Sequence, residues 1–139
     1  MGARAALWAG DAATARRLLD AETATAFWGP VLEVDRSRIA AGIAALEGRP
    51  EALAGFLDAV RAYDGLALPF EAAAAAVDMA VTLPDAVSSS GAAAAAVATA
   101  RETLTRLGAK PFLDRLDAAT AGTARKPAAS TSVRAGVAG

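Results

Sequence analysis

Cysteine and histidine are both absent from this 139-residue sequence. The chain therefore has no disulfides, no thiolate chemistry, none of the usual zinc sites and no catalysis that needs an imidazole. Sites built from carboxylates alone remain possible, so the composition narrows the enzymatic options without removing all of them. We expect no catalytic residue, no metal and no cofactor in this chain.

A strong charge of either sign and a long apolar run are also missing. The formal net charge is −1, which gives no overall field to attract nucleic acid or anionic lipid. The most apolar window, residues 66–83, is interrupted by Pro69, Glu71 and Asp78 and is too short and too acidic to span a bilayer. The first residues do not resemble a signal peptide. We therefore predict a soluble, cytoplasmic protein that binds neither a membrane nor, directly, nucleic acid.

Alanine is what the sequence has in abundance, at 42 of its 139 residues. Alanine has the highest helix propensity, β-branched residues are sparse, and no stretch alternates apolar and polar residues over the length of a strand. The pattern predicts an all-α protein whose helices are separated by glycine, proline and serine. The predicted elements are a short opening segment at 3–9 and helices near 11–27, 34–47, 50–64, 69–83, 90–107 and 111–120.

Several predicted helix ends carry a capping signal. Asp11 is expected to cap the helix that follows it, and Ser89 or Ser90 the helix that begins near residue 90. No strand precedes this serine loop and no lysine follows it, so we interpret it as a cap and not as an anion site. Gly48 and Gly108 suit the left-handed conformation that follows a helix C-terminus.

Two runs of five alanines, at residues 72–76 and 92–96, need a separate explanation. The helix predicted at 69–83 is apolar on nearly every side, which is typical of a helix buried among neighbours. Alanine lets helix axes approach more closely than large side chains do, so we expect the two alanine-rich helices to pack against each other. GC-rich coding bias is the alternative explanation for part of the alanine content.

Two helix junctions resemble each other and indicate a repeat. "ALWAGDAATA" (6–15) and "ALEGRPEALA" (45–54) each read as helix end, glycine, polar residue and alanine-rich helix start, and Gly10 and Gly48 lie 38 positions apart. A period of this size built from helix pairs is typical of tetratricopeptide-like or HEAT-like arrays. We predict antiparallel helix pairs in a short, right-handed, tetratricopeptide-like (TPR-like) solenoid over residues 1–121, followed by a disordered tail at 122–139.

Two longer motifs resemble a known family. "ALPFEAAAAAVDMA" (67–80) and "ARETLTRLGAKPFLDRLDAA" (100–119) are similar to the C-terminal TPR-like helical repeats of large actinobacterial signalling proteins, the nucleotide-cyclase-linked and LuxR-type regulators with an NTPase core. The matching residues are Leu68, Pro69, Glu71, Ala72, Arg106, Leu107, Gly108, Ala109, Pro111 and Phe112. The resemblance implies a helical-repeat fold and a scaffold or sensing role within a larger protein. The chain has no NTPase loop, cyclase signature or TPR Trp–Gly–Tyr consensus, so the resemblance implies no active site.

Five residues are candidates for an interaction surface: Trp8, Trp28, Tyr63, Glu71 and Asp78. The carboxylates of Glu71 and Asp78 fall on one line of an apolar helix, where they could face a groove and bind a basic partner or a cation. A solvent-facing stripe is the alternative interpretation. The aromatic residues could anchor a partner on a concave face between repeats or pack at the core, with Trp28 covering the end of its helix.

The sequence predicts a class of function but no specific activity. The first hypothesis is a non-catalytic protein-interaction or regulatory module that binds a protein or peptide partner, or neighbouring domains of a parent protein. The second is a small-ligand sensor with an apolar pocket between helices. The third, an enzyme built on carboxylates and arginines, has the least support. Arg36 and Arg38, close to the acids Glu33 and Asp35, are interpreted as a solvated helix face.

Overall fold

The computed structural model describes residues 2–25 and 27–121, which are helical apart from short connections. The helices are α1 (Gly2–Trp8), α2 (Ala12–Thr23), α3 (Pro30–Leu46), α4 (Ala52–Gly65), α5 (Pro69–Thr82), α6 (Pro84–Ser89) and α7 (Gly91–Leu107), followed by a helix at residues 110–121. No strand occurs in these described ranges, so the all-α prediction is confirmed. The tail predicted at 122–139 lies outside the described residues.

Most helix boundaries agree with the predicted ones, and the differences have local causes. α3 begins at Pro30 and not near residue 34, because proline fits the first helical position, where no backbone N–H is needed. α2 ends at Thr23, short of residue 27, and the hydroxyl of Thr25 beyond it donates to the carbonyl of Glu22. The six-residue α6 occupies a stretch whose proline and serines predict a turn; Pro84 again stands at the first position.

The predicted N-terminal caps are confirmed. Oδ1 of Asp11 accepts a hydrogen bond from the backbone N–H of Thr14 at 3.0 Å, and Oγ of Ser90 accepts one from Ala93 at 3.2 Å. Each side chain thereby satisfies a backbone donor that has no partner within its helix.

One C-terminal turn recurs at the ends of α1, α3 and α7. A glycine with positive φ (Gly10, Gly48 and Gly108) donates its N–H to the carbonyl three residues back, and the next residue donates to the carbonyl five residues back. This pattern is the Schellman motif, which favours glycine because its φ is left-handed. α4 ends in the same way with Ala67 in place of glycine, at φ 59°. The similar junctions at 6–15 and 45–54 thus share one turn geometry.

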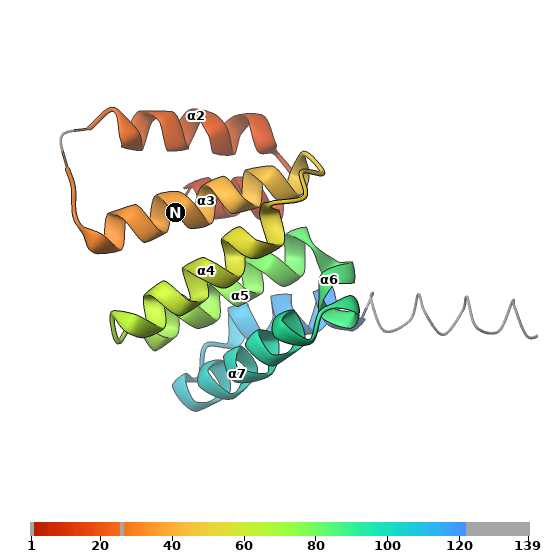
Figure 1. Cartoon of the computed structure of the whole chain (residues 1–139). Coiled ribbons are helices and arrows are strands. Elements are labelled where there is room, and N and C mark those ends of the chain that lie inside the picture. Colours follow the sequence, from red (N-terminus) through yellow and green to blue (C-terminus); the bar gives the residue numbers. More distant parts are fainter. Residues whose placement is uncertain (1, 26, 122–139) are drawn as a thin grey trace, which may run out of the picture.

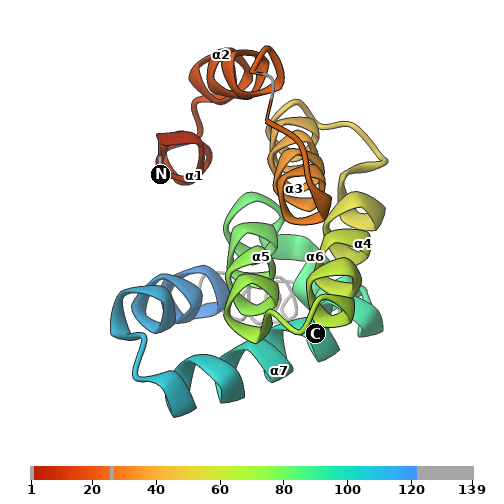
Figure 2. The same cartoon turned by 90° about the vertical axis from the view of Figure 1, so that its left-hand side faces the viewer.

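α5 lies at the centre of the helices. It contacts α1, α3, α4, α6 and α7, and every residue from Ala72 to Ala80 is buried. In Figures 1 and 2, α2 and α3 lie on one side of α5 and α7 lies on the other. The first alanine run is therefore buried, as its apolar pattern predicts. α7 packs against α5, but of the second run only Ala93 is buried, so close packing explains that run only in part.

Two glycines inside helices permit a close approach to neighbouring side chains. A Cβ at Gly42 in α3 would lie 2.6 Å from Cδ1 of Leu7 in α1, and a Cβ at Gly55 in α4 would lie 3.0 Å from Cβ of Ala41 in α3. Both distances are shorter than ordinary van der Waals contact. α3 thus packs tightly against α1 on one side and against the first half of α4 on the other.

α1 also contacts parts of the chain that are distant in sequence. The ring of Trp8 packs edge-to-face on Phe112 in the 110–121 helix, with ring centroids 5.5 Å apart, and Phe112 packs in the same way on Phe70 of α5 at 5.2 Å. α1, α5 and the 110–121 helix are therefore in contact through aromatic side chains of this chain. Each such edge-to-face pair adds a directional contribution to the burial of its rings.

Candidate functional site

A buried carboxylate, Asp78 of α5, lies between α1, α3 and α5. Its side chain is fully buried. Arg4 of α1 donates to it through Nε at 3.0 Å and Nη2 at 3.2 Å, Arg38 of α3 through Nη1 at 2.8 Å, and Trp8 of α1 through the indole Nε1 at 2.8 Å. Each carboxylate oxygen accepts at least two hydrogen bonds, which offsets the cost of removing the charge from water.

The hydrogen bonds continue from Arg38 to α4. Nε of Arg38 donates to the hydroxyl of Tyr63 at 3.3 Å, and that hydroxyl donates to Oδ1 of Asp35 in α3. Burial lowers the pKa of Arg38, but the charge of Asp78 and the hydrogen bond with Tyr63 outweigh it, so this pKa is raised above its ordinary value. Two arginines thus face two carboxylates in one connected set. We call it the Asp78 network; its members are Arg4, Trp8, Asp35, Arg38, Tyr63 and Asp78.

Tyr63 is 1% exposed and has a strongly shifted pKa. Burial, first, and the hydrogen bond to Asp35, second, raise its pKa to about 12, while Arg38 acts in the opposite direction. The phenol is therefore neutral at physiological pH and can donate a hydrogen bond to Asp35 while it accepts one from Arg38.

These positions correct several sequence-based interpretations. Asp78 and Tyr63 are buried and cannot contact a partner, so neither belongs to an interaction surface. Glu71 and Asp78 do not form a pair: Glu71 is half-buried in the first turn of α5, whereas Asp78 is held by α1 and α3. Arg38 is 8% exposed and does not belong to a solvated face. Trp8 is half-buried, and its indole N–H bonds to Asp78.

One signal in the sequence could have identified the buried carboxylate. A helix that is apolar on several faces is buried, and a charged residue in its middle must then be buried as well and needs an opposite charge. Asp78 satisfies both conditions. Its partners could not be found in this way, because the chain has 14 basic residues and no local spacing distinguishes Arg4 and Arg38 among them.

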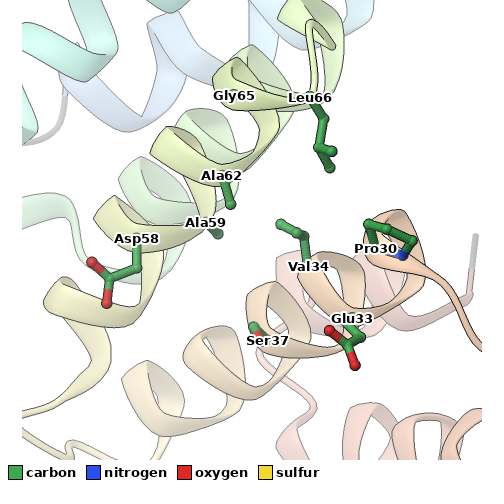
Figure 3. Close-up of a pocket in the computed structure, with 9 residues that line it drawn as sticks. All are labelled: Pro30, Glu33, Val34, Ser37, Asp58, Ala59, Ala62, Gly65 and Leu66. Atoms are coloured by element: carbon green, nitrogen blue, oxygen red, sulfur yellow. The ribbon is translucent and has the colours of Figure 1, made fainter.

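An open groove lies between α3 and α4 (Figure 3). Its volume is about 430 Å³, and its lining residues are Pro30, Glu33, Val34, Ser37, Asp58, Ala59, Ala62, Gly65 and Leu66. We call it the α3/α4 groove. Most of the lining is apolar, and the charged side chains in it, Glu33 and Asp58, are both acidic.

The groove exists because α3 and α4 separate with distance from the turn that joins them. Near that turn, Gly55 lets α4 approach Ala41 closely. Toward the other end, Figure 3 shows Pro30 of α3 and Leu66 of α4 on opposite sides of the opening, with Val34 pointing into the space between the helices. Valine and the alanines of α4 are too small to fill this space, so an apolar floor remains open to solvent.

Phe27 and Trp28 stand directly before α3 and are 75% and 74% exposed. The indole Nε1 of Trp28 donates to Oε1 of Glu33 at 2.8 Å, which holds the ring beside a residue that lines the groove. Arg36 donates to the carbonyl of Phe27 at 3.0 Å and so ties this segment to α3. The helix before Trp28, α2, ends at Thr23, and the indole is bonded to the first turn of α3 instead. Of the five candidate surface residues, Trp28 is the one presented to solvent beside the groove.

Among the described residues, no group of three or more acidic, histidine or cysteine side chains could hold a metal ion. Within the same ranges, no helix is both long and apolar enough to cross a membrane.

Comparison with known proteins gives no relative for this chain. No protein-family model matches it, and neither a curated protein nor a solved structure matches it significantly. Its resemblance to the helical repeats of actinobacterial regulators stays a prediction.

Proposed function

We propose that this chain is a non-catalytic protein-interaction or regulatory module of TPR-like helix pairs, which acts within a larger signalling or transcription regulator. The observation that carries the proposal is the open, mostly apolar α3/α4 groove together with Trp28, which is exposed and bonds to Glu33 of the groove lining. Exposed apolar patches mark binding sites, and tryptophan is enriched among the residues that dominate binding energy. The partner in this proposal is a protein or a peptide.

The order of the helices supports the TPR-like part of the proposal. Consecutive helices pack against one another from α1 to α5. The two motifs that resemble the regulators both serve turns and packing: Pro69 begins α5, Gly108 ends α7, and Phe112 follows and packs on Phe70. These roles agree with a scaffold in which the motifs carry structure and not catalysis.

The proposed binding face differs from the concave face expected between repeats. α1, α5 and the 110–121 helix are in contact through Trp8, Phe70 and Phe112, so a partner would have to displace packed rings there. The α3/α4 groove is open and has the exposed Trp28 at its side. We therefore place the partner on the α3/α4 groove.

A selection experiment tests this function. Phage-displayed random peptides are selected on the folded chain, and the affinity of each enriched peptide is then measured for the Trp28→Ala variant. Because Trp28 is largely exposed, its removal should leave folding unchanged. We expect it to weaken binding by roughly 30-fold, the effect of losing one binding hot spot.

Leu107→Ala is the matched control. Leu107 is also a large, exposed apolar residue, at 52%, but it ends α7 and does not line the groove. Its removal should leave the affinity unchanged. If no peptide is enriched, or if Trp28→Ala and Leu107→Ala have the same effect, the proposal fails.

A small-ligand sensor is the second candidate function. The observation that favours it is the volume of the groove, about 430 Å³, which lies in the range of small-molecule sites. Native mass spectrometry of the protein purified gently from its source cells separates the two candidates. A bound small-molecule mass that is lost when Val34 is changed to Trp, which fills the groove, would favour the sensor.

A further inference from the structure

We infer that the occupant of the α3/α4 groove is a cationic peptide segment, in which an apolar side chain is flanked by lysine or arginine. This inference rests on the proposed function and names the chemistry of the partner. It follows from the charge around the groove, the accessibility of that charge and the character of the floor.

The charged side chains that line the groove are both acidic. Glu33 comes from α3 and Asp58 from α4, and no lysine or arginine lines the groove. Figure 3 shows the two carboxylates on different helices, both pointing away from the opening into which Val34 points. An apolar segment with positive charges on both sides complements this arrangement, whereas an acidic segment would meet repulsion from both helices.

Both carboxylates can accept hydrogen bonds from a partner. Asp58 is 70% exposed and paired with Arg61, which is 69% exposed, and a surface pair of this kind contributes little to stability. A partner's cation can therefore replace Arg61 at Asp58. Glu33 accepts one hydrogen bond from Trp28, and a carboxylate has about four acceptor positions. Trp28 also presents an aromatic face to a lysine or arginine.

The floor of the groove selects an apolar side chain between those charges. Val34 and Ala62 are half-buried and Ala59 is buried, and their short side chains leave room for a longer one such as leucine or methionine. The walls are helices, whose backbone groups bond within each helix, so recognition has to come from side chains.

The test uses three labelled, end-blocked peptides and the full chain. The first peptide is RKLAALRK, the second replaces its basic residues with glutamate, and the third replaces its leucines with serine. Fluorescence anisotropy at low and at physiological salt measures the affinity of each. We expect only the first to bind, and more weakly at higher salt because the charges at the rim are exposed to solvent.

The second part of the test reverses the charge of single residues in the protein. We expect Glu33→Lys and Asp58→Lys each to weaken binding of the first peptide about tenfold or more. Asp114→Lys is the matched control: it makes the same charge change at a side chain that is 61% exposed, on the 110–121 helix. It should change the affinity less than about twofold.

The outcomes separate this inference from the proposed function. Peptides that require Trp28 but bind independently of Glu33 and Asp58 would overturn the cationic partner and leave the interaction module standing. If no peptide of any composition binds, both fail. Arg125 and Lys126 are basic residues of the chain's own C-terminal segment. If the first peptide binds more tightly after both are changed to serine, this segment competes for the groove, and the inference of a separate partner is overturned.

Discussion

Asp78 joins three helices through one side chain, because it accepts hydrogen bonds from Arg4 and Trp8 of α1 and from Arg38 of α3. Its replacement by alanine leaves the buried Arg38 without its ion-pair partner. We expect Asp78→Ala to lower the free energy of unfolding by about 3–5 kcal/mol, as measured by urea denaturation followed by circular dichroism. A loss below about 1 kcal/mol, the size of a surface ion pair, would contradict this prediction.

A triple variant serves as the control for Asp78. Arg4→Met, Arg38→Met and Asp78→Leu together remove the charges at these three positions and keep side chains of similar size. Replacing a buried ion cluster by apolar residues is often neutral or stabilising, so the triple variant should regain most of the stability that Asp78→Ala loses. If it is as unstable as the single variant, lost contacts and not an unpaired charge explain the effect.

The titration of Tyr63 reports on the Asp78 network. Tyr63 is the only tyrosine in the chain, so the tyrosinate signal comes from this residue alone. Burial raises its folded pKa to about 12, above the value of about 10 for an unfolded chain. The unfolded state therefore loses its proton first as the pH rises. The contribution of Tyr63 to the free energy of unfolding is fully present below pH 10. It falls by about 1.4 kcal/mol per pH unit between pH 10 and 12.

Tyrosinate absorbance of the folded protein should show a midpoint near pH 12, and the denatured protein should show one near 10. Asp35→Asn should lower the folded midpoint, because the hydrogen bond to a carboxylate favours the neutral phenol. The midpoint should remain above 10, since burial is the larger cause. A folded protein that titrates like the denatured one would show that Tyr63 is not buried as described.

At the scale of helices, small residues set how closely neighbouring helices pack, and of the described glycines Gly42 has the closest contact with a neighbouring helix. Gly42→Ala improves helix propensity by about 1 kcal/mol but places a methyl group against the buried Leu7. We expect a net loss of roughly 1–3 kcal/mol in the free energy of unfolding. Gly65→Ala, at a site with nothing within 4 Å, should be neutral or stabilising. The loss from Gly42→Ala should shrink in a Leu7→Ala background; otherwise the clash is not its cause.

Helix positions could be predicted because their signals are local. Asp11 and Ser90 mark helix starts, and Gly48 and Gly108 mark helix ends, each within a few residues of the backbone groups that they satisfy. The predicted start of α3 was wrong because proline is compatible with two interpretations. Pro30 could interrupt a helix or be the first residue of one. The helical class and most boundaries therefore follow from the sequence.

The candidate site depends on contacts that sequence spacing does not encode. Asp78 meets Arg4 across 74 positions and Arg38 across 40, and nothing in either neighbourhood indicates the pairing. The groove depends on how α3 and α4 pack along their length, and their close approach at Gly55 and Ala41 involves residues outside the groove lining. Trp28 was a sequence candidate, but its exposure became clear only from the fold.

At the scale of the whole molecule, the first and last described helices are in contact. In a linear repeat array each repeat touches only its neighbours, so a terminal repeat can unfold separately. Here α1 contacts α5, and Trp8 packs on Phe112. The contacts of α1 therefore link its unfolding to that of α5 and of the 110–121 helix.

We expect this linkage to make unfolding a single cooperative transition. In a Trp28→Phe variant, Trp8 is the only tryptophan, so its fluorescence reports the contact of α1 with Phe112, while circular dichroism reports all helices. The two probes should give the same urea midpoint. Phe112→Ala should lower both midpoints together, and should reduce the free energy of unfolding by about 1–3 kcal/mol for a half-buried ring. A fluorescence transition at lower urea than the dichroism transition would mean that α1 and α2 unfold first, as the end of an open array does.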